Sequence, residues 1–528
     1  MRIKKFLVLS TAFFCLTCFL QVTKSSETVS EIKDIEADLS VFETPMAKSL
    51  KRNVSQRRIS RMNNSQLKAA AEAMRADNYS ADFRIAEYKA FLCPEILGKQ
   101  LRIGEGYSKF ENMTGIYLPK GQHIVLVNNI EEGKTVELII PNWDRRPPED
   151  IDPTKDPDGW GVARKSYTLH NGVNIIDVVE WDGLAYINYY SESPELENTI
   201  EVHFVNAAVN GYFDIEYNSS DDWKKLLDNA VYPVIDARGK HIQIAYPVES
   251  LKKYAYDRGI ELVNNYDSLV FRQHRFIGLE KHDRVPDNRI LARVNYNYYM
   301  FRDRDGVAYK GTPPGYAMAM VVDPDRVISG DPCWGFSHEV GHVHQLRPYF
   351  NWGGMGEVSN NVVTLYVTTS FGNESRIYEQ NNYDQARESI IENNISFLHD
   401  PNVFNRLVPF WQLHLYFSTL GGQPDFYADL HEALRLQEPL PGETGDSRGR
   451  NMVAEFQLNF VKQACRVGQT DLTDFFEKWG FFWVGELEIR DYGNYNYNMT
   501  QDMVDACIEE IKSMNLPSPK VDLTKLKD

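Results

Sequence analysis

Gly335–Leu346 reads GFSHEVGHVHQL and places two histidines, His338 and His342, in the pattern H-E-x-x-H. In a helix, residues four positions apart project from one face, with Cβ atoms about 5–6 Å apart. Two imidazoles at this spacing can bind one zinc ion and leave room for other ligands. Glu339 follows the first histidine and can take a proton from a water molecule beside the ion. The stretch predicts a helix that carries a catalytic site with one zinc ion per chain.

A third ligand is expected from a second helix. Pro348 and the pair Gly353–Gly354 predict that the first helix ends and that a loop follows it. The second helix is expected to begin near Gly356, with Glu357 at its start and fourteen residues between Glu357 and His342. A carboxylate at this place completes a His₂Glu ligand set. An acid at a helix N-terminus also stabilises the helix dipole, so the position fits both roles.

Four further side chains near this motif are candidates for contact with a substrate. His344 is two positions past the second histidine, so it points away from the ligand face and is expected outside the ligand set. Trp352 can stack on a sugar ring, although a tryptophan lies more often in the core. Asn361 lies one turn from the carboxylate ligand and can orient it. Tyr366 and His344 are candidates for stabilising an oxyanion.

The N-terminus of the sequence predicts export. The basic stretch MRIKK precedes an apolar run from Phe6 to Leu20, which fits a signal peptide over residues 1–25 and is short for a membrane span. A lipid anchor on Cys18 is the alternative to cleavage. No second apolar run of spanning length is visible in the sequence. We therefore expect an exported protein in the periplasm, on the cell surface or secreted, either soluble or lipid-tethered.

Composition narrows the classes of partner. The chain has 528 residues, 43% of them hydrophobic, which is enough for two or three domains. Its formal net charge of −17 repels phosphate backbones, so we expect no nucleic-acid partner. We expect a monomer. The four cysteines after the leader are far apart and form no C-x-x-C pair, which excludes a disulfide framework or a zinc ribbon and leaves their pairing open: Cys93, Cys333, Cys465 and Cys507.

The pattern along the rest of the chain predicts an α+β protein with several domains. Residues 26–63 are polar and aperiodic and are expected to be a leader or linker. Residues 64–101 carry strong helix formers and predict a helical segment. Between 102 and 218, short alternating runs separated by turn signals predict a β-sandwich. Residues 219–528 are expected to form the metal-binding domain with a mostly helical C-terminal part, and a strand at 315–322 is expected as an edge for substrate.

The chain also resembles a known family. The segment HEVGH, followed by GEVSNN and an apolar helix, is similar to the M60-like, enhancin-type zinc metallopeptidases. The similarity covers about residues 65–485 and includes FRIAEYKAFLCPEILGKQL, YSKFENMTGIYLPKGQHIVLV, VPFWQLHLYF and DLTDFFEKWGFF. It implies a gluzincin-type catalytic domain preceded by a β-sandwich. It also implies that zinc is bound by His338, His342 and Glu357 and that Glu339 is the general base.

The resemblance, and no spacing or composition, implies the substrate. Members of the bacterial branch act on mucin-type O-glycosylated proteins, which implies a Gram-negative bacterium of the gut. The expected function is that of an exported zinc metalloendopeptidase that hydrolyses peptide bonds in such proteins. Three alternatives stay open: a glycan-binding surface protein with a vestigial metal site, a cell-surface adhesin, and a zinc peptidase that is indifferent to glycans.

Overall fold

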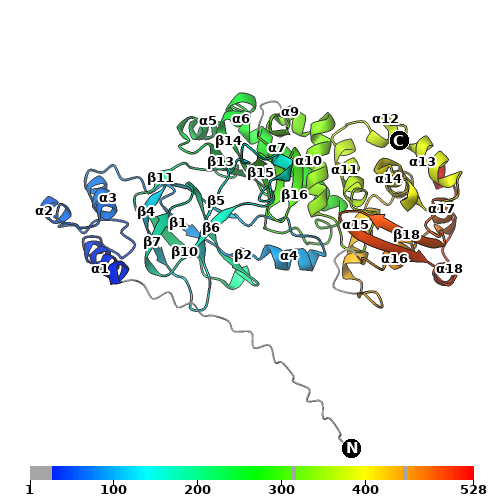
Figure 1. Ribbon diagram of the computed structural model, residues 1–528, viewed down its shortest axis with the longest axis horizontal. Helices are drawn as coiled ribbons and strands as arrows, with labels where there is room; N and C mark the ends of the chain where they lie inside the picture. The colour runs from blue at the N-terminus through cyan, green and yellow to red at the C-terminus, as the bar shows by residue number, and fades with distance from the viewer. Residues whose placement is uncertain (1–25, 312–316, 444–448) are drawn as a thin grey trace, which may run out of the picture. The chain divides into compact units, whose positions relative to one another are not determined.

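The computed structural model describes residues 26–311, 317–443 and 449–528 and contains both helices and sheets (Figure 1). The predicted signal peptide, with Cys18, lies outside these residues. The chain forms two compact units, of which one ends at Tyr79 and the other is Ser80–Asp528. Across the described ranges, no helix combines the length and the apolar character needed to cross a bilayer.

The N-terminal unit is folded, which corrects the prediction of a linker at 26–63. It contains α1 (Ser26–Leu39), α2 (Gln56–Ile59) and α3 (Ser65–Arg75), and the side chain of Asn64 caps α3. Most of its apolar side chains lie in turns and very short helices, so they show no helical period in the sequence. They are nevertheless buried against each other: Ile35, Val41, Phe42, Met46, Ile59, Met62 and Leu67.

Two antiparallel sheets begin the second unit. One has the order β1 (Ile85–Tyr88), β10 (Ile200–Phe204), β4 (Gly121–Asn128), β7 (Gly172–Val178). The other has the order β11 (Ala208–Val209), β3 (Asn112–Leu118), β8 (Gly183–Asn188), β5 (Glu137–Pro141), β6 (Arg164–Thr168). Apolar side chains from both sheets, such as Val125 and Leu138, belong to one buried cluster. The alternating runs between 102 and 218 therefore form strands.

The prediction of a helical segment at 64–101 is wrong in its middle. Ile85–Tyr88 forms strand β1 because it pairs with β10, and this tertiary pairing outweighs local helix propensity. Beyond it, β2 (Phe91–Leu92) pairs with β9 (Tyr190–Ser191). The helices at the two ends of the segment, α3 and α4 (Pro94–Leu101), are present.

A six-stranded mixed sheet follows and ends at an edge strand beside the H-E-x-x-H helix. Its order is β12 (Phe213–Asp214), β13 (Val234–Arg238), β14 (Ile242–Pro247), β15 (Ile290–Asn295), β17 (Gly306–Lys310), β16 (Met300–Asp303). The strand predicted at 315–322 is instead helix α8 (Ala317–Val321) in its described part, because a short apolar run fits a buried helix as well as a strand. The edge of the sheet is β16. Three helices accompany the sheet: α5 (Ser220–Asn229), α6 (Val248–Tyr254) and α7 (Gly259–Phe276).

The rest of the unit is mostly helical and packs in one large core with the mixed sheet. The four cysteines named above are free thiols, and all but Cys93 are buried. A hairpin interrupts the helices, formed by β18 (Gly485–Arg490) and β19 (Asn494–Met499). The main helices are α9 (Pro324–Val327), α10 (Gly330–Val343), α11 (Ser359–Ser370), α12 (Arg376–Glu379), α13 (Asn382–Ala386), α14 (Val403–His414), α15 (Phe426–Leu436), α16 (Val453–Gly468), α17 (Thr473–Lys478) and α18 (Gln501–Ser513).

Candidate metal centre

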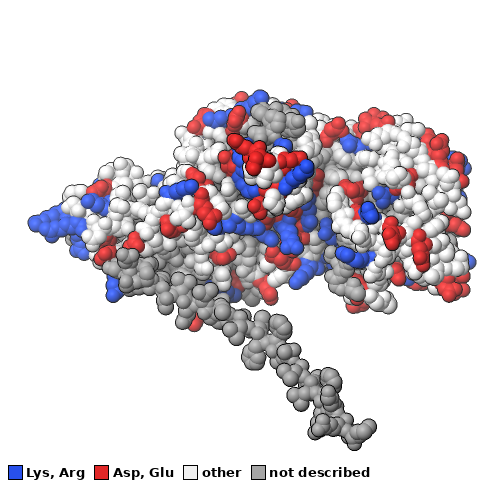
Figure 2. Space-filling model, viewed as in Figure 1, with Lys and Arg blue, Asp and Glu red and all other residues white. Residues whose placement is uncertain are grey.

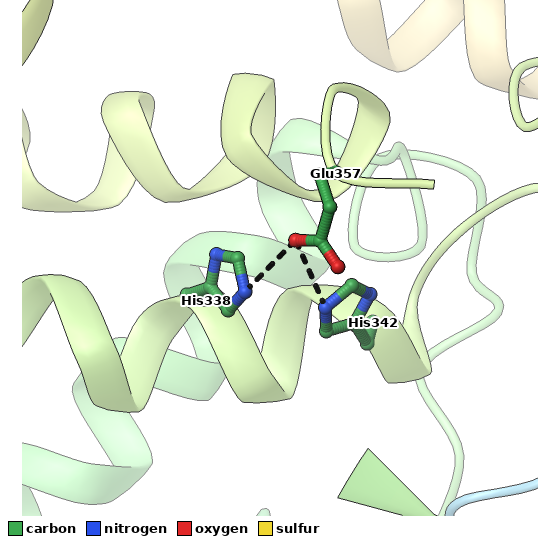
Figure 3. Close-up of side chains that lie close together, drawn as sticks. All are labelled: His338, His342 and Glu357. Carbon is green, nitrogen blue, oxygen red and sulfur yellow. Dashed lines mark ion pairs between the residues drawn. The ribbon is translucent and has the colours of Figure 1, made fainter. Parts of the chain in front are cut away.

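Helix α10 and the turn before α11 bring two imidazoles and a carboxylate together (Figure 3). His338 and His342 lie one turn apart on α10, with ring centroids 4.7 Å from each other. Oε2 of Glu357 lies 3.2 Å from Nε2 of His338 and 3.6 Å from Nε2 of His342. One ligand atom from each of the three residues lies within 4.8 Å of the others. The three ligand atoms thus face a common point.

Glu357 lies in a turn rather than in a helix, because α11 begins only at Ser359. This turn is fixed from outside by the tip of the β18–β19 hairpin. The backbone N–H groups of Gly354 and Gly356 both donate to Oδ2 of Asp491, each at 2.9 Å. The carboxylate ligand is therefore held by a contact between segments that are 135 residues apart in the sequence.

The Nδ1 atom of each imidazole ring, on the side away from Glu357, contacts an amide side chain. Oδ1 of Asn361 lies 2.7 Å from Nδ1 of His338, and Oε1 of Gln345 lies 3.2 Å from Nδ1 of His342. An amide oxygen accepts a hydrogen bond, so these contacts favour a proton on Nδ1 and make Nε2, which faces Glu357, the atom that would bind a metal. Asn361 also donates to the backbone carbonyl of Glu357 at 2.6 Å. Asn361 is buried and contacts two of the three candidate ligands, so its contacts support the orienting role expected for it.

This donor set fits zinc. Two imidazole nitrogens and one carboxylate oxygen would form a three-ligand site with open positions, as catalytic zinc sites require. The hydrogen bonds behind both rings are the support that such ligands need. Close packing of α10 on α11 also contributes, because a Cβ added to Gly341 would lie 3.0 Å from the backbone oxygen of Asn360.

The charges in the centre depend on one another. Burial raises the pKa of Glu357, but hydrogen bonds and charge interactions with both histidines outweigh it and hold that pKa well below its usual range. Burial lowers the pKa of His338, yet the neighbouring carboxylates of Glu357 and Glu339 bring it above its ordinary value. Glu339 is only 6% exposed, and this burial raises its pKa. The ionised carboxylate of Glu357 therefore favours a cation at this site, and Glu339 beside it is the more basic carboxyl group.

Three tentative substrate residues do not lie at this centre. His344 is 1% exposed, and its ring contacts Gln273 and Tyr107 in the core behind α10. Trp352 is fully buried and packs against Phe460. Neither side chain can reach a substrate at the surface, because each is enclosed by the core.

Tyr366 is the third. It follows Asn361 by five positions, which places it about 140° around α11 from the face that meets His338. Its ring packs against Phe276 and His414, at centroid distances of 4.9 and 5.7 Å. Tyr366 therefore supports the packing of α11 on its neighbours.

Tyr492 is a residue at the site that the sequence did not reveal. It sits at the tip of the β18–β19 hairpin with a φ of +53°, and its hydroxyl donates to Oε1 of Glu357 at 2.5 Å. The side chain is otherwise open to solvent, since the residue is 83% exposed. The letters DYG between two alternating runs predict a turn, but they carry no sign of where that turn lies in space.

An aromatic cluster with one exposed ring, that of Trp160, lies beside the edge strand next to α10. Trp160 is 55% exposed, and its ring lies 4.5 Å from that of Tyr298 and 4.7 Å from that of Phe301 between centroids. The neighbour of Phe301 on β16 is Met300, whose methyl group would be 3.0 Å from a Cβ added to Gly335. The cluster is thereby joined through β16 to the helix that carries the two histidines.

The fold is shared with solved structures. A metallopeptidase from Bacteroides thetaiotaomicron superimposes with a TM-score of 0.78 over 94% of this chain and 81% of that one, with 23% sequence identity. A metallopeptidase in complex with Tn antigen gives a TM-score of 0.72 over 86% of this chain and 81% of that one, also with 23% identity. At these identities the likeness concerns the fold.

Sequence comparison identifies the family. A putative lipoprotein AcfD homologue from Escherichia coli K12 is 22% identical over 445 residues, which cover 77% of this chain but only 28% of that protein. The sequence model of peptidase M60, enhancin and enhancin-like proteins matches residues 208–480, a span that includes the whole metal centre and more than half of the chain. The chain therefore belongs to the peptidase M60 family.

Proposed function

We propose that this chain is a zinc metalloendopeptidase that cleaves peptide bonds in O-glycosylated, mucin-type proteins. The observation that carries the proposal is the convergence of three ligand atoms within 4.8 Å beside a buried glutamate. His338, His342 and Glu357 would hold the ion. When bound, zinc polarises a carbonyl oxygen and lowers the pKa of a water molecule.

Glu339 has the position of a general base. It follows His338 directly on α10, so it stands beside the ligands without belonging to the group of converging atoms. Its burial raises its pKa, which strengthens it as a proton acceptor. We infer that Glu339 takes the proton of the attacking water and passes it to the leaving amine.

Tyr492 has the position of an oxyanion donor. Its hydroxyl reaches Glu357 from the solvent side, so it lies where a substrate carbonyl would approach the ligands. A hydroxyl donor stabilises the negative charge that develops on the carbonyl oxygen of a substrate. We assign this role to Tyr492 in place of Tyr366 and His344, which face the core.

The glycan requirement rests on the aromatic cluster. Exposed tryptophan and tyrosine rings offer flat apolar faces and polar edges, on which a sugar ring can stack. Trp160, which is exposed, and Tyr298, which is partly exposed, offer such a surface beside β16, with the buried ring of Phe301 behind them, and the outer edge of β16 can pair with an extended peptide. A peptide in this position would bring its glycan to the cluster. A similar fold has been solved with Tn antigen bound, which supports the same class of ligand here.

The remaining assignments belong to the same proposal. Residues 102–218 would form a β-sandwich domain and residues 219–528 the catalytic domain. The signal peptide would direct export, and the protein would then act as a monomer, either released after cleavage of that peptide or tethered by a lipid anchor. The first relative is named a lipoprotein, which is consistent with a place at the cell surface.

Cleavage of a mucin tests the proposal. Wild-type protein should cleave it, a zinc chelator should stop the reaction, and added zinc should restore it. Glu339→Gln should bind zinc and cleave nothing. Cleavage by Glu339→Gln would contradict the mechanism. Equal cleavage of intact and deglycosylated mucin would support a peptidase indifferent to glycans, and tight binding without cleavage by the wild type would support a glycan-binding protein.

A further inference from the structure

The N-terminal unit carries a basic patch in an acidic protein. From Thr44 to Ala71 the sequence contains seven basic residues and no Asp or Glu, whereas the whole chain has a formal net charge of −17. Figure 2 shows Lys and Arg side chains gathered over α2. We call this surface the basic patch: Lys48, Lys51, Arg52, Arg57, Arg58, Arg61 and Lys68.

Most of these cations are not used by the fold. Arg58 donates to the hydroxyl of Ser40, and Lys68 donates to the backbone carbonyl of Ser60. Among the residues that the structure describes, four other members form no ion pair or side-chain hydrogen bond, and all four are exposed: Lys51, Arg52, Arg57 and Arg61. Their charges are therefore available to a partner.

The patch is cationic without an apolar component. Ile59 and Met62, which lie among the arginines in the sequence, are buried in the unit and do not reach the surface. No aromatic residue occurs between Thr44 and Ala71. A surface that inserts into a bilayer pairs its cations with exposed apolar side chains, and a surface for single-stranded nucleic acid adds stacking aromatics. The composition of the patch favours a partner that is bound by charge alone.

We propose that the basic patch binds the anionic groups of a polyanionic glycan, either sulfate esters or the carboxylates of sialic acid. The inference rests on the proposed function, because such groups occur on mucin-type glycoproteins. A polyanion is repelled by a protein with a net charge of −17, so a separate cationic surface gives the enzyme a place to hold it. The patch would thus keep the glycoprotein bound to the enzyme through contacts that do not involve the metal centre.

Binding by the full-length chain tests this inference. Glu339→Gln serves as the background, so that binding is measured without cleavage. The patch variant carries Lys51→Gln, Arg52→Gln, Arg57→Gln and Arg61→Gln. The control variant loses the same charge at four exposed lysines of the second unit: Lys99→Gln, Lys120→Gln, Lys240→Gln and Lys253→Gln. The probes are mucin, sialidase-treated mucin, desulfated mucin, vesicles of phosphatidylcholine and phosphatidylglycerol in equal parts, and a short DNA duplex.

The patch variant should bind mucin at least about tenfold more weakly than the background, since four charged contacts are lost, and the control should bind as the background does. Binding should also weaken from about 50 to about 500 mM NaCl. Loss after sialidase or after desulfation identifies the anionic group. Binding that survives both treatments, equal loss in the two variants, or tighter binding to vesicles or DNA would overturn the inference.

The two proposals fail separately. Cleavage of a short peptide with one neutral sugar should be equal for the wild type and for the patch variant made without Glu339→Gln. If mucin binding depends on the patch but no peptide is cleaved, the proposed function is wrong and the patch assignment holds. If peptides are cleaved but mucin binding ignores the patch, only the inference drawn from the patch is wrong.

Discussion

The hydroxyl of Tyr492 donates to Oε1 of Glu357 at 2.5 Å, across 135 residues of sequence. It links the tip of a hairpin to the carboxylate of the metal centre. Asp491 at the same tip accepts hydrogen bonds from the N–H groups of Gly354 and Gly356, both of which shortly precede Glu357. The hairpin therefore holds the carboxylate proposed as the third ligand and places a hydroxyl group beside it.

Tyr492→Phe should lower kcat about 10²-fold, because removing one oxyanion donor costs a rate factor of this order. Zinc affinity should change much less, since the ligands stay in place. Steady-state kinetics on a glycopeptide and zinc content by mass spectrometry check the two expectations. An unchanged kcat would exclude Tyr492 as the oxyanion donor, and loss of zinc would indicate a role in positioning Glu357 instead.

Asn361→Ala should weaken zinc binding about 10- to 100-fold, since groups behind the ligands have effects of this size. It removes the acceptor at Nδ1 of His338 and the contact with the backbone of Glu357. Competition with a chromophoric chelator measures the dissociation constant. The matched control is Asn78→Ala, an exposed asparagine of the N-terminal unit, which should bind zinc as the wild type does. Equal affinity of the two variants would argue against a positioning role for Asn361.

Gly341→Ala should destabilise the protein by about 1–3 kcal/mol, the usual cost of overpacking. The added methyl group would lie 3.0 Å from the backbone oxygen of Asn360, so α10 and α11 must move apart and separate the histidines from Glu357. Gly98→Ala in α4 is the control, because its methyl group would meet nothing closer than 3.4 Å. Chemical denaturation compares the two, and similar unfolding free energies would contradict the packing argument.

Stability should fall in acid because histidines are buried in neutral form. Burial lowers the pKa of His431 to about 3 and that of His414 to about 4. The folded state then binds fewer protons than the unfolded state, so the stabilisation is complete above the unfolded pKa of about 6.5 and is lost below it. Between the unfolded pKa and the lowered folded pKa, each such histidine changes the free energy of unfolding by about 1.4 kcal/mol per pH unit. Unfolding free energies at pH 7 and 5.5 should therefore differ less in His431→Gln than in the wild type, and equal differences would contradict this.

The local part of the metal centre could be predicted from the sequence, and the distant part could not. His338, Glu339 and His342 follow from the spacing of one helix, and Glu357 follows because the next helix is close behind in the chain. Tyr492 depends on a long-range contact that leaves no periodic trace. Proximity in the sequence was misleading for Trp352, which lies only ten residues from His342 but in the core.

The same distinction holds for the fold. The strands between 102 and 218 are visible because one face of each is buried, which imposes a period of two. The local sequence predicts helix for Ile85–Tyr88 and strand for Ala317–Val321, and both predictions are wrong, because the conformation depends on pairing with β10 in the first case and on the surrounding core in the second. In the N-terminal unit only α3 is visible in the sequence, because the other buried residues lie in turns and in helices of very unequal length.

The aromatic cluster provides a test of substrate choice. Trp160→Ala removes the exposed ring that lies against Tyr298 and Phe301. We expect KM for a glycopeptide to rise about two- to tenfold, since stacking on one ring contributes about 0.5–1.5 kcal/mol. The kcat should change less, because the ring lies outside the ligand set. An unchanged KM would move glycan recognition away from this cluster.

The central claim is zinc-dependent cleavage that requires a glycan, and one pair of peptides tests it most directly. The two peptides share one sequence and differ only in a single GalNAc on one threonine. Mass spectrometry after incubation with zinc-loaded wild type and Glu339→Gln reports the products. We predict cleavage of the glycosylated peptide by the wild type alone and no cleavage of the bare peptide. Equal cleavage of both peptides, or cleavage by Glu339→Gln, would contradict the account.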